Sequence, residues 1–258
     1  MQPTMLNVIR HGAAGSNPPL LIVHGLYGSG RNWGVIARRL ADERLVLAPD
    51  MRNHGDSFRS DSHSYADLAA DLAEVIEAEG APADVVGHSM GGKAAMVLAL
   101  TRPDLLRRLV VADIAPVTYG HSQVQYIHAM RAVDLSKVEK RSDAVAQLAK
   151  DVPDKTLQSF FTQSLDLTNR RWRLNLDALE AEMPKILGFP KVEGQFENPA
   201  LFLTGGQSDY VRPEHRPAIR ALFPKARFAK LPKAGHWLHA EEPRDFEATV
   251  RAFLNWQD

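Results

Sequence analysis

A serine between glycines is the first residue whose surroundings could support chemistry. The segment Gly87-His88-Ser89-Met90-Gly91 fits the pattern G-x-S-x-G. Residues 83–86 before it are typical of a buried strand, and residues 93–101 after it are typical of a helix. Small neighbours permit a sharp strand-to-helix turn that exposes the hydroxyl near a helix N-terminus, where backbone amides favour negative charge. We predict that Ser89 is a nucleophile; the alternative is a serine that only caps a helix.

A serine hydroxyl is a weak nucleophile near pH 7 and needs a base within hydrogen-bonding reach. His236 follows the last expected strand and precedes the C-terminal helix, where such a base is expected. His239 lies three residues later, so a metal pair is the competing interpretation. No further histidine or carboxylate motif nearby completes a metal site. We predict that His236 is the base and that no metal binds.

Two aspartates could orient the histidine. Asp113 follows the apolar run 109–112, and Asp209 lies in Gly205-Gly206-Gln207-Ser208-Asp209 after the run 201–203. Both positions are at carboxyl ends of expected strands, where the crevice of an open α/β sheet forms. Either carboxylate could fix the imidazole tautomer and stabilise its charged form. Residue order and spacing leave this choice open.

Acyl transfer also needs hydrogen-bond donors aimed at the developing oxyanion. One donor is expected to be the backbone amide of Met90, which follows the serine. The second is expected in the glycine-rich segment 24–30, because glycine permits turns that expose an amide. We predict the N–H of Leu26 there. A phosphate-binding loop is the alternative, but this segment lacks both the Gly-Lys-Ser/Thr and the G-x-G-x-x-G order.

These residues must be positioned by a repeating order of strands and helices. Apolar, β-branched runs at 20–23, 45–48, 85–86, 109–112, 201–203 and 227–231 alternate with helical periodicity at 33–40, 65–79, 93–101, 213–222 and 246–256. Several runs are apolar on consecutive residues, which is typical of strands covered on both faces. We predict an α/β fold with a mostly parallel sheet flanked by helices, and residues 5–10 as an antiparallel edge strand.

One stretch interrupts this order. Residues 118–198 show helical patterns at 126–133, 141–150, 156–161 and 172–184 and no convincing strand. We interpret the stretch as a helical cap over one end of the sheet. The chain, residues 1–258, is then one domain with a core at 1–117 and 199–258 and a cap at about 118–198.

Composition restricts the partners and the location. Lys+Arg and Asp+Glu both number 31, so nothing supplies long-range attraction to nucleic acid or an anionic membrane. There is no cysteine, which excludes disulfides and thiolate nucleophiles. The N-terminus lacks a signal-peptide pattern, and no apolar run approaches the ~20 residues of a membrane helix. We expect a soluble, cytoplasmic monomer or small homo-oligomer.

The ordered motifs resemble a known family. They are HGLYGSGRNW (24–33), DMRNHGDS (50–57), GHSMGGK (87–93), VADIAPV (111–117), GGQSDYV (205–211) and AGHWLHAEEP (234–243). Over nearly the whole chain the sequence resembles α/β-hydrolases and is most similar to the small YbfF-type esterases. The resemblance implies the chain order serine, acid, histidine. It favours Asp113 as the acid, whereas the wider superfamily would place the acid at Asp209.

The resemblance implies a serine carboxylic-ester hydrolase for small to medium acyl esters, working through an acyl-enzyme and without a cofactor. Thioester hydrolysis on acyl-CoA is the nearest alternative, with phosphate contacts at Arg170, Arg171 or Arg173. The same scaffold would also suit a serine C–C hydrolase or a non-catalytic module that binds a small ligand. The small-molecule partner of the hydrolase is an acyl ester or thioester.

Several further residues receive structural interpretations. We expect Asp50 and Arg52 to stabilise a turn through backbone contacts or a buried ion pair. His88 is expected to pack rather than react. For each of seven aromatic residues, core packing is favoured over a place in the pocket: Trp33, Tyr119, Phe160, Phe161, Trp172, Tyr210 and Trp237.

Overall fold

The computed structural model describes residues 5–80 and 82–256. Within them, seven strands form one sheet in the order β1-β3-β2-β4-β5-β8-β9. These strands are β1 (Val8–His11), β2 (Leu20–Val23), β3 (Val46–Pro49), β4 (Ala83–His88), β5 (Leu106–Ala112), β8 (Ala200–Gly205) and β9 (Ala226–Leu231). All neighbouring pairs are parallel except β1 with β3. The predicted mostly parallel sheet and its antiparallel N-terminal edge are confirmed.

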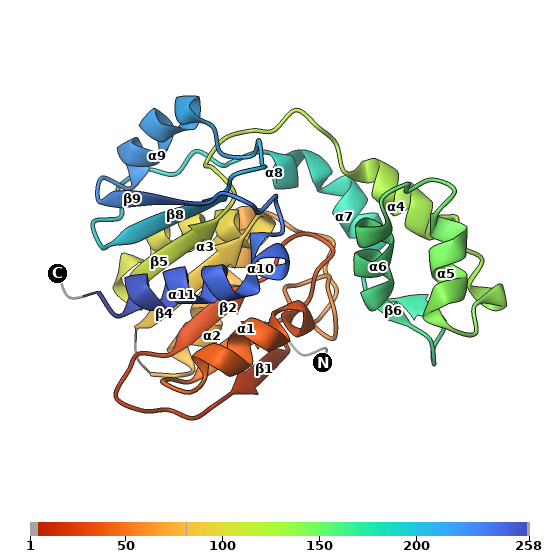
Figure 1. Ribbon diagram of the computed structural model, residues 1–258, viewed down its shortest axis with the longest axis horizontal. Helices are drawn as coiled ribbons and strands as arrows, with labels where there is room; N and C mark the ends of the chain where they lie inside the picture. The colour runs from red at the N-terminus through yellow and green to blue at the C-terminus, as the bar shows by residue number, and fades with distance from the viewer. Residues whose placement is uncertain (1–4, 81, 257–258) are drawn as a thin grey trace.

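Helices cover both faces of the sheet (Figure 1). One face carries α1 (Gly34–Leu40) and α11 (Pro243–Leu254), and the other carries α2 (Tyr65–Glu77), α3 (Met90–Thr101) and α9 (Arg216–Leu222). Shorter helical segments are η1 (Gly30–Trp33), η2 (Pro103–Leu105), η4 (Pro213–His215) and α10 (Leu238–Glu241). Leu20 and Ile22 of β2 enter the core beneath α1, whereas Leu21 and Val23 enter the opposite core. The runs are continuously apolar because each strand serves two cores.

The segment between β5 and β8 contains the expected helices, which Figure 1 shows to one side of the sheet. They are α4 (Val124–Arg131), η3 (Leu135–Lys137), α5 (Arg141–Leu148), α6 (Lys155–Gln163), α7 (Leu176–Ala181) and α8 (Met183–Leu187). We call this segment, residues 118–198, the insertion.

The expectation of no strand in the insertion is wrong. β6 (Leu165–Asp166) and β7 (Arg171–Trp172) form a two-stranded antiparallel ribbon. Its turn is held by the Asp166 carboxylate, which accepts the Asn169 amide at 3.1 Å. Two-residue strands give no periodic signal, and for the same reason the helix expected from residue 172 begins only at Leu176.

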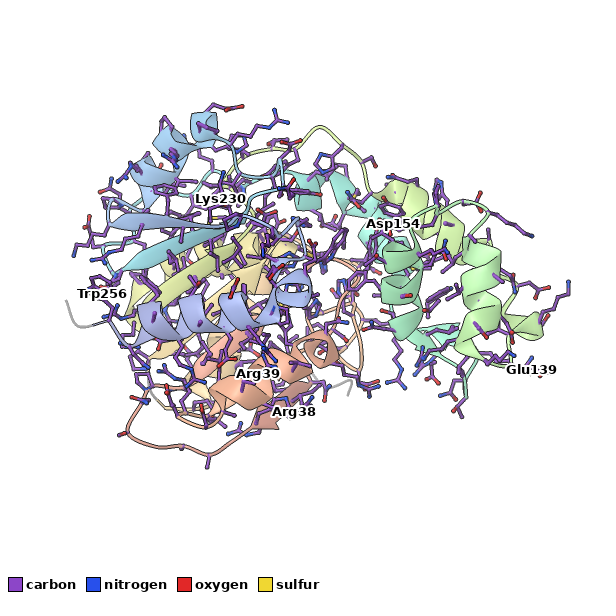
Figure 2. All side chains as sticks on the ribbon, viewed as in Figure 1. Arg38, Arg39, Glu139, Asp154, Lys230 and Trp256 are labelled. Atoms are coloured by element: carbon purple, nitrogen blue, oxygen red, sulfur yellow. The ribbon has the colours of Figure 1, made fainter. Side chains whose placement is uncertain are left out.

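Charged side chains cover the outside of the molecule. Figure 2 shows Arg38 and Arg39 on α1, Glu139 and Asp154 on the insertion and Lys230 on the edge strand β9, all of them exposed. No helix in the described ranges combines the length and apolar character needed to cross a membrane.

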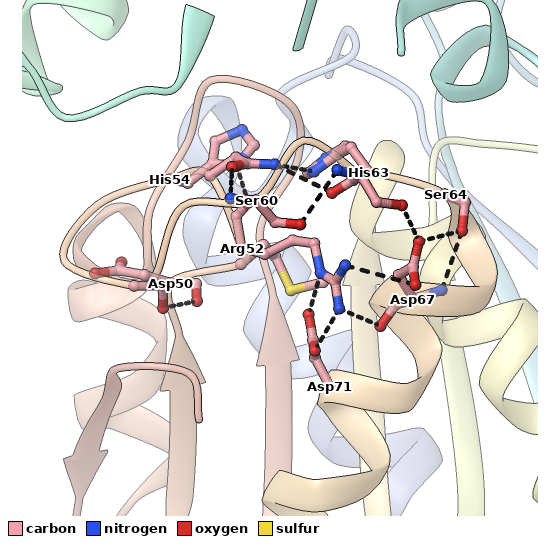
Figure 3. Close-up of polar contacts among 12 residues, drawn as sticks. Asp50, Arg52, His54, Ser60, His63, Ser64, Asp67 and Asp71 are labelled. Carbon is pink, nitrogen blue, oxygen red and sulfur yellow. Dashed lines mark hydrogen bonds and ion pairs between the residues drawn. The ribbon is translucent and has the colours of Figure 1, made fainter. Parts of the chain in front are cut away.

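The turn after β3 is organised by two buried charged residues, as expected. The Asp50 carboxylate accepts the backbone amides of Gly30 at 2.8 Å and Asp56 at 2.9 Å. Arg52 forms a two-pronged ion pair with Asp71 of α2, at 2.6 and 2.8 Å (Figure 3). Asp50 therefore joins this turn to the loop after β2, and Arg52 joins it to α2.

Replacing Asp50 with alanine should destabilise the fold. The Asp50→Ala variant leaves the buried Gly30 amide and the partly buried Asp56 amide without their acceptor, so we expect the free energy of unfolding to fall by about 3 kcal/mol. Urea denaturation measures this change. The matched control is Asp61→Ala, at an exposed position in the same loop, which should change stability by less than about 0.5 kcal/mol. Equal losses in the two variants would contradict this role for Asp50.

Candidate active site

Ser89 occupies a strained turn between β4 and α3. Its backbone has φ 53° and ψ −121°, in the left-handed half of the map that non-glycine residues rarely adopt. Gly87 and Gly91 on either side of Ser89 must be glycine because other backbone atoms approach their Cα atoms closely. A Cβ on Gly87 would lie 2.4 Å from the carbonyl oxygen of Gly91, and one on Gly91 would lie 2.4 Å from that of His24. The strand-to-helix turn predicted for Ser89 is present.

A chain of hydrogen bonds runs from Ser89 through His236 to Asp113. His236 Nε2 lies 3.1 Å from Ser89 Oγ, and His236 Nδ1 lies 2.8 Å from Asp113 Oδ2. His236 follows β9, and its side chain is only 12% exposed. A neutral imidazole with its proton on Nδ1 donates to the carboxylate and presents a bare Nε2 to the serine. His236 Nε2 can therefore accept the proton of the Ser89 hydroxyl.

Asp113 is fully buried and tied to the loop after β8. Its Oδ1 accepts the amide of Gly205 at 3.0 Å, and its Oδ2 accepts the hydroxyl of Ser208. Asp209 is brought to a different place. It is exposed, and its backbone carbonyl accepts the Arg212 guanidinium at 3.1 Å. Of the two candidate acids, Asp113 faces His236.

Tyr210 and His88 fix the imidazole of His236 from two sides. The Tyr210 ring stacks on it with centroids 3.8 Å apart and planes at 17°. His88 Nε2 donates to the His236 carbonyl at 2.8 Å, so His88 packs and also positions its neighbour. The sequence carries no signal for Ser208, because a loop serine next to an acid is common. For Tyr210 the sequence indicates only an aromatic of the core or the pocket.

The two residues predicted to supply the oxyanion amides are both on the wall of one cavity. Leu26 and Met90 line the same cavity as Ser89 and His236. Met90 is the first residue of α3, and the first amides of a helix have no acceptor within it. Next to Leu26, the Tyr27 amide donates to His54 Nε2 at 3.1 Å.

The cavity wall is largely aromatic. The sequence favours core packing for seven aromatic residues, but six of them line this cavity: Trp33, Tyr119, Phe160, Phe161, Tyr210 and Trp237. Trp172 does not; it is buried in the insertion, where its indole N–H donates to the Met130 carbonyl at 2.9 Å. The core and the cavity share one wall here, because Trp33 and Phe161 are both at most 1% exposed. Sequence periodicity could not separate the two roles.

A buried lysine that sequence reasoning missed also lines the cavity. Lys93 of α3 donates to the carbonyls of Leu187 at 2.8 Å and Gly188 at 2.6 Å, at the end of α8. A cation is favoured at a helix C-terminus, where carbonyls lack partners. Burial lowers the pKa of Lys93 to about 7. Lys93 thereby joins the helix after Ser89 to the returning end of the insertion.

Five other histidines near the site are buried. His24 donates from Nδ1 to the Gly25 carbonyl and accepts the Met51 amide at Nε2. The ring of His239 stacks on that of Trp33, with centroids 4.1 Å apart. Burial lowers the pKa of His63 and of His239 to about 3, and it also lowers the pKa of His24, His54 and His88. In residues 5–80 and 82–256 no cluster of three or more potential metal ligands is found.

The fold and this arrangement define a hydrolase. Residues 18–243 match the model of a protein family described as alpha/beta hydrolase fold. The chain belongs to this family, and within it to the YbfF type.

Individual relatives agree with this assignment. The chain is 43% identical over 248 residues to the sn-1-specific diacylglycerol lipase ABHD11 of Mus musculus, covering 92% of this chain and 81% of that protein. It is 37% identical to the esterase YbfF of Escherichia coli, covering 93% of this chain and 94% of that protein. The solved structure of a marine microorganism esterase superposes with a TM-score of 0.91 at 36% identity, covering 96% and 99% of the two chains.

The buried neutral histidines predict loss of stability in acid. Their folded pKa values lie below the unfolded value of about 6.5, so stability is full above that pH. Below it the unfolded chain takes up protons that the folded chain does not, and each such histidine costs about 1.4 kcal/mol per pH unit. His239→Phe keeps a ring on Trp33 and removes one of these protons.

Urea denaturation between pH 7.5 and 5 tests this prediction. The difference in unfolding free energy between His239→Phe and wild type should be constant above pH 7. Below pH 6 it should change in favour of the variant by about 1.4 kcal/mol per pH unit. A difference that stays flat across the whole range would contradict it.

Proposed function

We propose that this chain, an ester hydrolase of the α/β-hydrolase family, cleaves carboxylic esters of small to medium acyl chains with Ser89, His236 and Asp113 as its triad. The observation that carries the proposal is the continuous hydrogen-bonded path from the Ser89 hydroxyl to the buried Asp113 carboxylate, at 3.1 and 2.8 Å. A module that only binds a small ligand needs no base beside a strained serine, so this path favours an enzyme over a binding module.

The proposed reaction has two stages. In the first, Ser89 Oγ attacks the acyl carbonyl while His236 Nε2 takes the serine proton, and the ester C–O bond breaks as His236 returns that proton to the leaving alcohol. In the second, His236 takes a proton from water and the hydroxide attacks the acyl-enzyme carbonyl. The bond between the acyl carbon and Ser89 Oγ then breaks as His236 returns the proton to Ser89, and the carboxylic acid leaves. Asp113 holds the imidazole tautomer and stabilises its cationic form in both stages. The chemistry uses no cofactor.

The amides of Leu26 and Met90 hold the oxyanion in this proposal. Their place on the wall of the cavity that Ser89 also lines supports the assignment. Each donor of this kind typically contributes about 100- to 1000-fold in rate. The insertion acts as a cap, because Phe160 and Phe161 of α6 supply apolar wall to the cavity that Ser89 lines.

The contacts of the insertion favour an ester over an acyl-CoA thioester. Arg173 pairs with Asp56 at 2.8 Å, Arg171 lies 3.6 Å from Asp166, and Arg170 donates to the Ser136 carbonyl at 2.8 Å. The three cations that could have met a nucleotide phosphate thus have partners already. The names of the relatives, an esterase and a diacylglycerol lipase, also support an ester substrate. We also propose a cytoplasmic enzyme that is a monomer or small homo-oligomer, because a chain without cysteine is compatible with a reducing compartment.

Hydrolysis of matched p-nitrophenyl ester and acyl-CoA series, from acetyl to palmitoyl, tests the substrate class. We expect ester turnover that peaks at one chain length, because an enclosed cavity fits a limited acyl volume, and loss of that turnover in Ser89→Ala. A preference for the CoA series would move the proposal to thioesterase. Equal rates for wild type and Ser89→Ala would contradict the proposal that Ser89 is the nucleophile.

A pair of matched substitutions tests the acid. Asp113→Asn should lower kcat by about four orders of magnitude, because the amide stabilises the wrong tautomer of His236. Asp209→Asn makes the same carboxylate-to-amide replacement at an exposed side chain and should keep near wild-type turnover. Steady-state kinetics on the preferred ester measure both. The reverse pattern would assign the role to Asp209 instead.

A further inference from the structure

Tyr27 makes contacts that the proposed reaction does not use. It follows Leu26 in the loop after β2, is 3% exposed, and has φ 64°, a left-handed conformation that is uncommon outside glycine. Such a conformation persists only where the surroundings hold it. Tyr27 is held by its amide, its carbonyl, its hydroxyl and its ring.

The amide side of Tyr27 is held by the core. Its N–H donates to His54 Nε2 at 3.1 Å, and His54 in turn donates from Nδ1 to the Arg52 carbonyl at 2.9 Å. Figure 3 shows His54 in the turn that Arg52 anchors to Asp71. The peptide between Leu26 and Tyr27 is therefore fixed to a buried, neutral imidazole.

The remaining three contacts come from the insertion. The Tyr27 carbonyl accepts the hydroxyl of Ser164, at the end of α6, at 3.0 Å. Its own hydroxyl donates to the carbonyl of Gln123, just before α4, at 2.9 Å. Its ring meets Phe161 of α6 edge-on, with centroids 5.6 Å apart. Two separate helices of the insertion thus hold the residue next to the predicted oxyanion donor.

A second contact ties the same loop to α6. Asn32 donates from Nδ2 to Gln163 Oε1 at 2.5 Å, while its Oδ1 accepts the Ser29 amide at 2.6 Å. The loop is therefore held by the insertion at two points, before and after its glycine turn.

We propose that Tyr27 is a positioning residue through which the insertion sets the orientation of the Leu26 amide in the oxyanion hole. The inference rests on the proposed function, because it assigns a role to that amide. The insertion then does more than supply the acyl wall. Its contacts with Tyr27 decide whether the second oxyanion donor points at the reacting carbonyl, so breaking those contacts lowers the rate of chemistry even when the substrate still binds.

Two conservative variants test the coupling. Ser164→Ala removes the bond to the Tyr27 carbonyl, and Tyr27→Phe removes the bond to Gln123 while keeping the ring on Phe161. Each should lower kcat about tenfold, a part of the 100- to 1000-fold contribution of one donor, with KM within about twofold. Because both bonds fix the same residue, the double variant should lose less than the product of the two single losses.

The matched controls break contacts elsewhere. Arg59→Gln removes bonds from the core to the insertion carbonyls of Trp172 and Leu174, which lie outside the cavity wall. Ser136→Ala removes an exposed hydroxyl of the insertion that bonds Asp134. Both should keep wild-type kcat. Thermal unfolding of all variants separates a positioning role from a general loss of stability.

A p-nitrophenyl phosphonate provides the second readout, because its phosphoryl oxygen takes the place of the oxyanion when Ser89 displaces p-nitrophenolate. The rate of Ser89 labelling, followed by intact mass, should fall in Ser164→Ala and Tyr27→Phe in parallel with kcat. Unchanged labelling and kcat, or equal losses in Arg59→Gln, would overturn the coupling while leaving the proposed function intact. Failure of wild-type Ser89 to label or turn over esters would overturn both.

Discussion

The arrangement of the site depends on one buried carboxylate. Asp113 accepts hydrogen bonds from the Gly205 amide and the Ser208 hydroxyl and lies 2.8 Å from His236. Its own amide donates to the Leu203 carbonyl at 2.9 Å. An ionised carboxylate without access to water is tolerated only when such donors surround it. The ends of β5 and β8 and the loop after β9 are therefore held in one relative position by one side chain.

Five buried histidines around the loops near Ser89 are kept neutral by burial. His24, His54, His63, His88 and His239 all have lowered pKa values because the core desolvates them. A neutral imidazole has one donor and one acceptor, and His24 and His54 use both on backbone groups of the loops near Ser89. These rings shape the backbone without adding positive charge that would oppose a proton on His236.

The fold and the turn that carries Ser89 could be predicted because they depend on local patterns. Continuous apolar runs located the strands, and the glycines around Ser89 located a turn that tolerates no Cβ at Gly87 or Gly91. The choice between Asp113 and Asp209 could not be made from spacing, because both follow strands. It depends on which loop turns its carboxylate inward, and that is decided by Ser208 and Gly205. The β6–β7 ribbon could not be predicted because two-residue strands carry no period.

In the proposed mechanism the acyl pocket and the loop that carries the Leu26 amide are not independent parts, because the insertion contacts both. Phe161 forms cavity wall and also packs against Tyr27, and Ser164, three residues further on, bonds the Tyr27 carbonyl. A change in α6 that alters the acyl wall therefore alters the support of the residue beside Leu26. Substrate selectivity and rate would be coupled through α6 in this enzyme. Variation of the pocket is then least disruptive at Leu157 or Phe160, which line the cavity from the same helix and make no hydrogen bond to that loop in the described part of the chain.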